Sequence, residues 1–187
     1  MRIVAGRFRG LKLDAPKSRR IRPTADRIRE ALFSIIASRV PGSRVLDLFA
    51  GTGALGLEAL SRGAVEAVFV DQSAEAVRII RANIQRLGVL EQVEVLQGGV
   101  IQVVRRLAER KSLFDLIFMD PPYGRGLIET TLPHLGGLAG SDSLLIAEHP
   151  AKELAPDSSV EWRRVDRRSY GDTAISFYSR EASHTHV

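Results

Sequence analysis

The feature that most constrains the fold of this 187-residue chain is an alternation of two patterns from Pro41–Gly42 onward. Short, nearly continuous apolar runs alternate with segments whose apolar residues recur every three or four positions. The apolar runs cover residues 44–49, 67–71, 93–96, 114–120 and 143–148. The helical patterns cover residues 55–62, 74–87 and 100–110, with an irregular stretch over 126–138. Apolar strands separated by helices indicate a parallel sheet covered on both faces, so we predict a doubly wound α/β fold.

Both ends of the chain depart from this alternation. Residues 160–166 and 173–179 flank a Ser-Tyr-Gly-Asp turn and predict an antiparallel hairpin that ends the sheet. The first residues predict a small basic β-hairpin with a turn through Gly6–Gly10, followed by a basic connector. We therefore divide the chain into an N-terminal extension over 1–22, a principal domain over 23–180 and a flexible tail over 181–187.

A helix is expected over residues 24–39, between the extension and the first apolar run. Thr24 is a plausible N-cap, and Asp26 lies in the first turn, where a negative charge is favourable. Apolar residues spaced three and four apart predict one buried stripe on this helix. The stripe consists of Ile28, Ala31, Leu32, Ile35 and Ile36.

Composition narrows the class of protein. The chain has no cysteine, so it forms no disulfide, and its four histidines show no metal-ligand spacing. No apolar run approaches the roughly 20 residues that span a bilayer, and the N-terminus does not resemble a secretory signal. We therefore expect a cytoplasmic protein without a membrane segment and without a metal. Ten of the 27 basic residues fall within the first 29 positions, which favours a polyanionic partner.

The first apolar run leads directly into a glycine-rich turn, V-L-D-L-F-A-G-T-G-A-L-G. Ligands of doubly wound sheets bind beyond the carboxyl ends of the strands, where this turn is expected. Gly51 and Gly53 allow a sharp bend and close approach of a ligand, while Gly56 is expected to allow a helix to pack on a strand. Asp47 precedes the glycines, where it would repel a pyrophosphate but suit an ammonium or sulfonium. This favours S-adenosylmethionine over a dinucleotide.

The second and third runs add cofactor candidates at the same edge. Asp71 ends the second run, where a carboxylate can accept hydrogen bonds from both ribose hydroxyls. Asp71 could otherwise cap the following helix, but Ser73 is the better N-cap. After the third run, Gly99 and Val100 lie where adenine is expected, and contacts there would come from backbone groups.

The fourth run ends in Asp120-Pro121-Pro122-Tyr123. Two prolines cannot donate to a sheet, so they end the strand and stiffen the loop. If Asp120 and the Pro121 carbonyl accept the two N–H bonds of an exocyclic base amine, its nitrogen lone pair can point at a methyl group. Tyr123 would stack on a base swung out of its helix or loop. A surface turn without function is the simpler reading of D-P-P-Y taken alone.

The pairing of D-L-F-A-G-T-G with D-P-P-Y resembles the amino-methyltransferases of the (Asn/Asp)-Pro-Pro-aromatic type. The segments M-R-I-V-A-G-R-F-R-G and R-P-T-A-D-R-I-R-E-A-L-F resemble the bacterial 16S ribosomal RNA guanine-N2 methyltransferase family, and the likeness extends to about Arg180. The resemblance implies a Rossmann-like class I methyltransferase that methylates the N2 amine of one guanine in the small ribosomal subunit. It implies S-adenosylmethionine as methyl donor, S-adenosylhomocysteine as product, no metal and a monomeric enzyme.

The resemblance also assigns roles by position. The catalytic loop would be residues 120–123. Cofactor-binding residues would be Asp47, Gly51, Gly53, Asp71, Gln72, Val100, Thr24 and Arg27. For Thr24 and Arg27, a helix cap and a solvated arginine are equally good interpretations. The residues that contact RNA phosphate would be Arg7, Arg9, Lys17, Arg19, Arg20 and Arg22.

Two other kinds of function remain open from the sequence. A DNA adenine-N6 or cytosine-N4 methyltransferase would need a sizeable target-recognition insertion, which is absent. A protein glutamine methyltransferase would be expected to have asparagine at position 120. A catalytically inactive RNA-binding ribosome-assembly factor is opposed by Asp47, Asp71 and the intact 120–123 loop.

Overall fold

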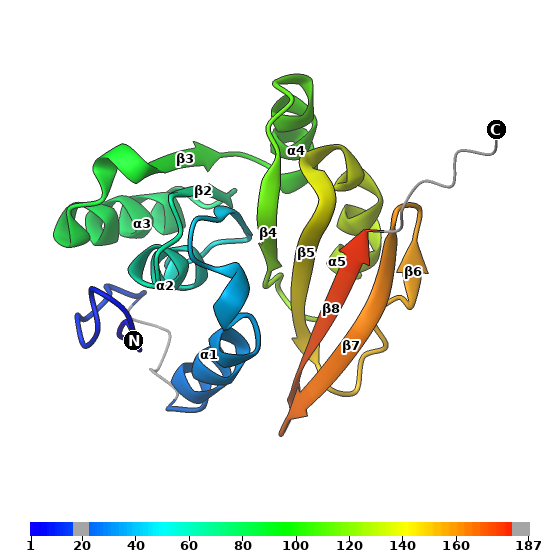
Figure 1. Ribbon diagram of the computed structural model, residues 1–187, viewed down its shortest axis with the longest axis horizontal. Coiled ribbons are helices and arrows are strands. Elements are labelled where there is room, and N and C mark those ends of the chain that lie inside the picture. Colours follow the sequence, from blue (N-terminus) through cyan, green and yellow to red (C-terminus); the bar gives the residue numbers. More distant parts are fainter. Residues whose placement is uncertain (17–22, 181–187) are drawn as a thin grey trace.

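Within the part of the chain that the structure, a computed structural model, describes (residues 1–16 and 23–180), one eight-stranded sheet runs through the molecule (Figure 1). The strand order is β3-β2-β1-β4-β5-β8-β7-β6. The parallel strands are β1 (Arg44–Leu48), β2 (Glu66–Asp71), β3 (Val93–Gln97), β4 (Phe114–Met119) and β5 (Ala139–Pro150). The antiparallel strands are β6 (Ser158–Ser159), β7 (Trp162–Tyr170) and β8 (Thr173–Arg180).

Helices cover both faces of this sheet. The α-helices are α1 (Pro23–Ile35), α2 (Ala54–Ser61), α3 (Ala74–Leu87), α4 (Val100–Glu109) and α5 (Leu127–Thr131). Short 3₁₀ turns are η1 (Ala37–Arg39), η2 (Leu90–Gln92), η3 (Leu132–His134) and η4 (Gly136–Leu138). The predicted doubly wound α/β fold with a terminal antiparallel hairpin is confirmed. None of the described helices has the length and apolar character needed to cross a bilayer.

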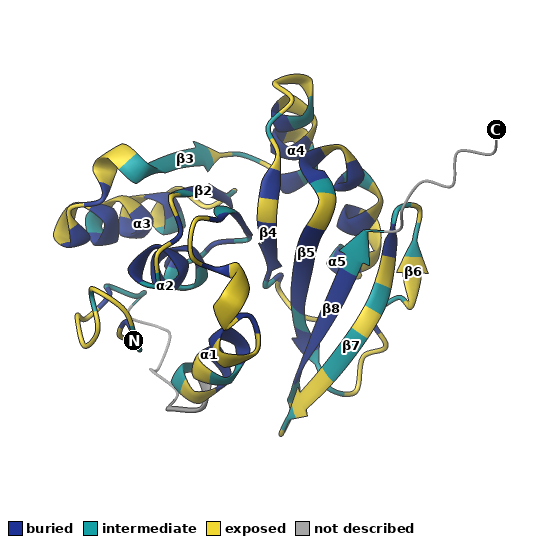
Figure 2. Ribbon diagram, in the orientation of Figure 1, coloured by how far each residue is buried: buried dark blue, intermediate teal, exposed yellow. Residues whose placement is uncertain are grey.

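Two buried clusters form the core, one on each face of the sheet. The first joins side chains of α1, α2 and α3 to one face and includes Phe33, Leu57 and Ile80. The second joins α4 and α5 to the other face and includes Val103 and Ile128. Burial of one large aliphatic or aromatic side chain contributes about 1.5–3 kcal/mol, so the two clusters hold the sheet between its helices. Figure 2 shows the buried central strands and the alternating exposure of β7 near the sheet edge.

The strand order places two functional loops side by side. The chain order reverses between β1 and β4, which pair in parallel from Val45–Leu116 to Leu48–Met119. The glycine turn after β1 and the D-P-P-Y loop after β4 therefore leave the sheet at the same edge. Doubly wound sheets bind ligands at such a reversal.

Three details differ from the sequence-based expectations. Ile35 was predicted to be buried but is 43% exposed, whereas Phe33 is fully buried. The reason is contact with the sheet, since the Phe33 ring lies 5.7 Å from that of Phe118. The short edge strand β6 and the turn η2 were not predicted, because two or three residues carry no readable period.

The N-terminal extension does not form the predicted regular β-hairpin, and it packs against the principal domain. Arg2 and Lys12 form an isolated antiparallel bridge, and no longer strand is present in residues 1–16. Ile3 and Leu13 are buried in the same cluster as α1, α2 and α3. The boundary predicted at residue 22 therefore does not separate two cores, while the predicted tail, 181–187, lies outside the described residues.

Candidate active site

The glycine turn bends as its sequence predicts. Gly51 and Gly53 have φ of +58° and +76°, in the left-handed region that favours glycine. Gly53 is also the N-cap of α2. A Cβ at Gly56 would lie 2.4 Å from Cε1 of Phe69 on β2, which supports the packing role inferred for that glycine.

Asp47 lies behind this turn and is almost completely buried. Its Oδ2 accepts a hydrogen bond from the Gly56 amide at 2.9 Å, so the carboxyl group braces the start of α2. Burial raises the pKa of Asp47 to about 8, and the nearby charges of Asp120 and Asp71 act in the same direction. Asp47 is not among the residues that line the cavity in front of the turn.

Asp71 joins the end of β2 to the glycine turn. Its Oδ2 accepts from the Gly51 amide and its Oδ1 from the Ser73 amide, each at 2.8 Å. The Ser73 hydroxyl accepts from the Ala76 amide at 3.3 Å, so Ser73 is the N-cap of α3, as expected. Asp71 therefore fixes two backbone segments and also faces the cavity.

A cavity of about 550 Å³ lies between the glycine turn, the end of β2, the start of α4 and the D-P-P-Y loop. This volume is within the roughly 300–1,000 Å³ typical of small-molecule sites. Six of the predicted site residues line it: Gly51, Asp71, Gln72, Val100, Asp120 and Pro122. Gly99, which was named beside Val100, lines it as well.

Two other predicted cofactor residues, Gly53 and Arg27, are not part of this wall. Gly53 acts in the turn behind it, Arg27 is exposed on α1, and the Thr24 side chain lies outside the described residues. Pro16, the last described residue of the N-terminal extension, also lines the cavity.

Several wall residues were not selected from the sequence. Among them, Phe49 has φ of +58°, a conformation that is strained by about 1–3 kcal/mol for a non-glycine residue. Arg125, Gln102 and Thr131 also line the cavity. The sequence signal for Phe49 and Arg125 was their place beside the two motifs, while Gln102 and Thr131 lie on helices that only the tertiary fold brings to the cavity.

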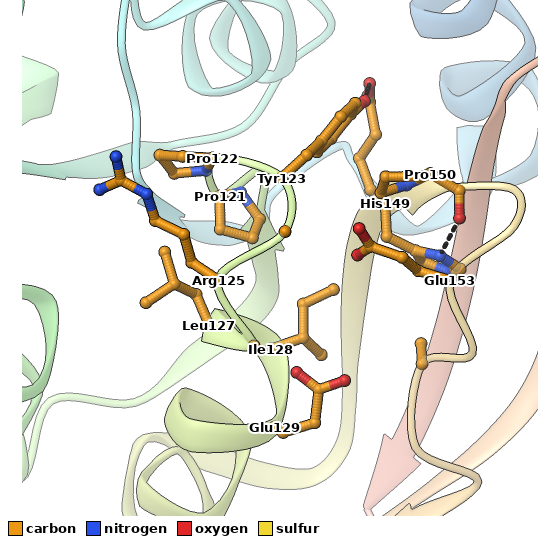
Figure 3. Close-up of a pocket in the computed structure, with 14 residues that line it drawn as sticks. Pro121, Pro122, Tyr123, Arg125, Leu127, Ile128, Glu129, His149, Pro150 and Glu153 are labelled. Atoms are coloured by element: carbon orange, nitrogen blue, oxygen red, sulfur yellow. Dashed lines mark hydrogen bonds between the residues drawn. The ribbon is translucent and has the colours of Figure 1, made fainter.

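The D-P-P-Y loop presents different residues on its two sides (Figure 3). Tyr123 and Arg125 extend in opposite directions from it. The Tyr123 hydroxyl donates to Oε1 of Glu148 at 3.2 Å, and the side chain is 49% exposed. Partial burial, followed by the charges of Glu148 and Asp120, raises the pKa of Tyr123 to about 12, so the phenol stays protonated at neutral pH.

A second cavity lies beside Tyr123, between the loop, α5 and the end of β5. Its volume of about 20 Å³ accommodates a water molecule rather than a nucleobase. A ligand as large as a nucleobase could lie only at its mouth, beside the half-exposed Tyr123. Pro122, Arg125 and Leu127 line both cavities, so the loop is a shared wall between them.

His149 fixes the end of β5 at this second cavity. Nδ1 lies 2.9 Å from the Pro150 carbonyl (Figure 3), so it is the protonated nitrogen. Nε2 accepts from the Ser176 hydroxyl at 2.9 Å. Burial lowers the pKa of His149, which keeps the ring neutral.

The N-terminal extension is held on α2 by buried polar groups. The Glu58 carboxylate accepts from the amides of Val4 and Ala5 at 2.8 and 3.0 Å. The Ser61 carbonyl accepts from the Arg7 amide at 2.8 Å. The chain passes so close that a Cβ at Gly6 would lie 1.9 Å from the Ser61 carbonyl oxygen.

Asn83 of α3 holds the far end of the extension and the glycine turn together. Its Oδ1 accepts from the Asp14 amide at 2.7 Å, and its Nδ2 donates to the carbonyls of Asp14 and Thr52 at 3.1 and 3.0 Å. Asn83 is fully buried, so these bonds are shielded from water.

The predicted RNA-binding residues divide into two groups. Arg7 and Arg9 are exposed on the extension, and Arg7 lies over the Phe8 ring at 4.5 Å while donating to the Gln92 side chain at 2.5 Å. Lys17, Arg19, Arg20 and Arg22 lie outside the described residues.

Comparisons with known proteins agree with this architecture. A family model described as "Conserved hypothetical protein 95" matches residues 1–179. "Ribosomal RNA small subunit methyltransferase D" of Escherichia coli (strain K12) is 35% identical over 189 residues, covering 97% of this chain and 91% of that protein. The solved structure of the Escherichia coli protein yhhF matches with a TM-score of 0.82 and 33% identity, covering 97% of this chain and 98% of that one.

A more distant structure shares the fold alone. The protein SMU.776, solved in complex with SAH, matches with a TM-score of 0.70 and 16% identity over 85% of this chain and 50% of that one.

Proposed function

This chain belongs to the family described as conserved hypothetical protein 95, with relatives named ribosomal RNA small subunit methyltransferase D, and from that premise we propose its reaction. It is an S-adenosylmethionine-dependent methyltransferase that methylates the exocyclic N2 amine of a guanine in 16S ribosomal RNA. The observation that supports this proposal most directly is that the D-P-P-Y loop separates the two cavities. Asp120 lines the large cavity and Tyr123 lines the small one.

The large cavity suits S-adenosylmethionine in size and in the groups it offers. Gly51, which has no side chain, leaves room for the methionine part to approach the backbone, and Asp71 and Gln72 lie where the ribose hydroxyls would bind. Val100 begins α4 and would contact the adenine ring. Asp47, beneath the turn, supports this site by accepting the bond from the Gly56 amide rather than by its charge, because its raised pKa leaves it largely protonated at neutral pH. Bound S-adenosylmethionine supplies a methyl group on a sulfonium and leaves as the neutral thioether S-adenosylhomocysteine.

The loop residues supply the positioning. Asp120 and the Pro121 carbonyl accept the two N–H bonds of the guanine amine, so that the nitrogen lone pair points into the large cavity. Tyr123 stacks on the extruded base. Asp120 would also be placed to accept the proton that the amine releases on methylation, either directly or through water. No metal ion is needed, because the leaving group is already neutral when it departs.

The N-terminal extension provides the RNA contact. Arg7 and Arg9 are exposed on a segment that Glu58 and Ser61 hold in place, so they can contact phosphates without being ordered by RNA first. Such contacts should weaken strongly as salt rises. We further propose that the enzyme acts as a monomer in the cytoplasm on the small subunit or an assembly intermediate of it.

The experiment is methyl transfer from labelled S-adenosylmethionine to small ribosomal subunits from a strain that lacks the gene. We expect N2-methylguanosine in the digested RNA, and loss of the label with Asp120→Ala but not with the control Asp142→Ala, which changes an exposed aspartate far from both cavities. Naked 16S RNA, DNA and protein are tested alongside. Label in DNA or protein instead would refute the substrate, and absence of both labelling and cofactor binding would refute the enzymatic function.

A further inference from the structure

We propose that Glu148 selects guanine by accepting the N1–H of the target base. This inference rests on the proposed function, because it concerns how the same site distinguishes guanine from other bases. Glu148 belongs to no sequence motif considered above, and it comes from β5 rather than from the D-P-P-Y loop.

The first support is the register of the sheet. β4 and β5 pair in parallel, and their last pair is Met119 with Ala147. The next residue of each strand is Asp120 and Glu148, so the two carboxylates leave the sheet at the same level on neighbouring strands. Neighbouring strands lie about 4.8 Å apart, which is close enough for the two side chains to converge on one edge of a ligand.

The second support is the bond from Tyr123. Its hydroxyl donates to Glu148 Oε1 at 3.2 Å, which directs the carboxylate toward the ring on which the base would stack. Glu148 and Asp120 are both close enough to Tyr123 for their charges to raise its pKa. Tyr123 and Glu148 line the small cavity, and Asp120 lines the large cavity on the other side of the loop. Tyr123 therefore lies between the two carboxylates, and the charges of both act on it.

The third support is the rigidity of the strand end that carries Glu148. The next residue, His149, is buried and held by the Pro150 carbonyl and the Ser176 hydroxyl. A group that must discriminate between bases by one hydrogen bond needs such a fixed backbone.

The chemistry of the base edges gives the selection. Guanine presents N1–H and the N2 amine side by side, so Asp120 and Glu148 can each accept one of them. Adenine and cytosine present an unprotonated ring nitrogen beside their amines, and its lone pair would face the Glu148 carboxylate. Glu148 is partly buried, and a base stacked on Tyr123 would cover it further. An acceptor that loses its donor in such a place disfavours the wrong base.

The test uses a base that keeps the reacting amine but lacks N1–H. 2-Aminopurine carries the C2 amine, and its N1 is an acceptor. Small subunits are reconstituted with 16S RNA carrying either guanine or 2-aminopurine at the target position, and kcat/KM for methyl transfer is compared. We expect the wild-type protein to prefer guanine by about 100-fold or more.

The decisive variant is Glu148→Gln, whose amide can donate to N1 of 2-aminopurine. Its amide oxygen can still accept N1–H of guanine, but more weakly than a carboxylate. We therefore expect reduced activity on guanine and a guanine-to-2-aminopurine ratio lowered at least about tenfold, which one hydrogen bond of about 1.4 kcal/mol would produce. Glu91→Gln, the same change at an exposed site on η2, should leave the ratio unaltered. The two proteins are compared by their guanine-to-2-aminopurine ratios because 2-aminopurine also lacks the O6 atom of guanine. That loss affects the wild-type protein and the Glu148→Gln variant alike, so it does not change one ratio relative to the other.

The outcomes separate the two proposals. If wild-type protein forms no N2-methylguanosine, the proposed function fails. If it does, but methylates 2-aminopurine equally well, the role of Glu148 is refuted without recourse to any variant. An unchanged ratio in Glu148→Gln also refutes it. Melting temperatures of the variants are measured in parallel, and Glu148→Ala should lose guanine activity without gaining any on 2-aminopurine.

Discussion

Replacement of Glu58 by alanine should destabilise the whole protein and release the N-terminal extension. The Glu58 side chain is completely buried, and its two oxygens accept from the amides of Val4 and Ala5. Arg62 Nε donates to Oε1 at 2.8 Å, and Arg29 Nε lies 3.5 Å from Oε2. Arg29 is itself buried, so one carboxylate balances a buried cation and two backbone donors.

The magnitude follows from what Glu58→Ala leaves behind. Removal of one partner from a buried ion pair typically destabilises a protein by about 3–5 kcal/mol, because the remaining charge is uncompensated. Asp26 stays in contact with Arg29 at 3.0 Å, which places the expected loss toward the lower value. For a protein of this length, about 1 kcal/mol shifts the melting temperature by about 2–4 °C, so we expect a decrease of roughly 6–20 °C.

Two measurements test this reasoning. Urea unfolding gives the change in the free energy of unfolding, with Glu30→Ala as the control because Glu30 is exposed on α1. Amide hydrogen exchange at Val4 and Ala5 reports whether the extension has been released. A loss smaller than about 1 kcal/mol, or unchanged exchange at both amides, would show that Glu58 does not hold the extension.

Four further outcomes are expected. Asp47→Asn should stabilise the fold by an amount that grows from pH 4 to pH 8 in denaturation experiments. The folded wild-type protein raises the pKa of Asp47 from 3.8 to about 8, so its free energy of unfolding falls as pH rises through this window, whereas asparagine does not titrate. A pH-independent difference between the two proteins would contradict this. Gly6→Ala should lower the melting temperature more than Gly10→Ala, since both have positive φ but nothing lies within 4 Å of a Cβ at Gly10. Tyr123→Ala should reduce kcat/KM on RNA about 10–100-fold through lost stacking, and Tyr123→Phe much less; equal losses would argue against stacking. Asp71→Ala should raise the Michaelis constant for S-adenosylmethionine about 10–100-fold and that for RNA little, and the reverse would move the cofactor site.

The sheet and its helices were predictable because their signals are local. The run at 74–87 has apolar residues on one face and ends at Gly88, and α3 has the predicted bounds. The apolar runs became β1 to β5 with ends shifted by only a few residues. The fold buries β1, β2, β4 and β5 between its helices, while the edge strand β3 is partly buried. The spacing of apolar residues along the sequence was enough to predict these helices and strands, without knowing which elements pack against them.

The candidate site was predictable only in part. Motifs identified Asp71, Gly51 and Asp120, since each lies at the end of a strand or in its following turn. Glu148 was missed because its place beside Asp120 depends on the pairing of β4 with β5, which no short motif encodes. The docking of the extension was missed for the same reason, because Glu58 and Asn83 are more than fifty residues from the amides they hold.

The position of Asn83 also bears on how such a protein can change over evolution. Its amide bonds on one side to Asp14 and on the other to Thr52, in the turn that forms the cofactor cavity. A deletion or exchange of the first sixteen residues would leave this amide with buried, unmatched groups, which are costly inside a protein. The extension therefore cannot be exchanged independently of the domain. A recombinant protein joined at this boundary should be less stable unless α3 is exchanged together with the extension.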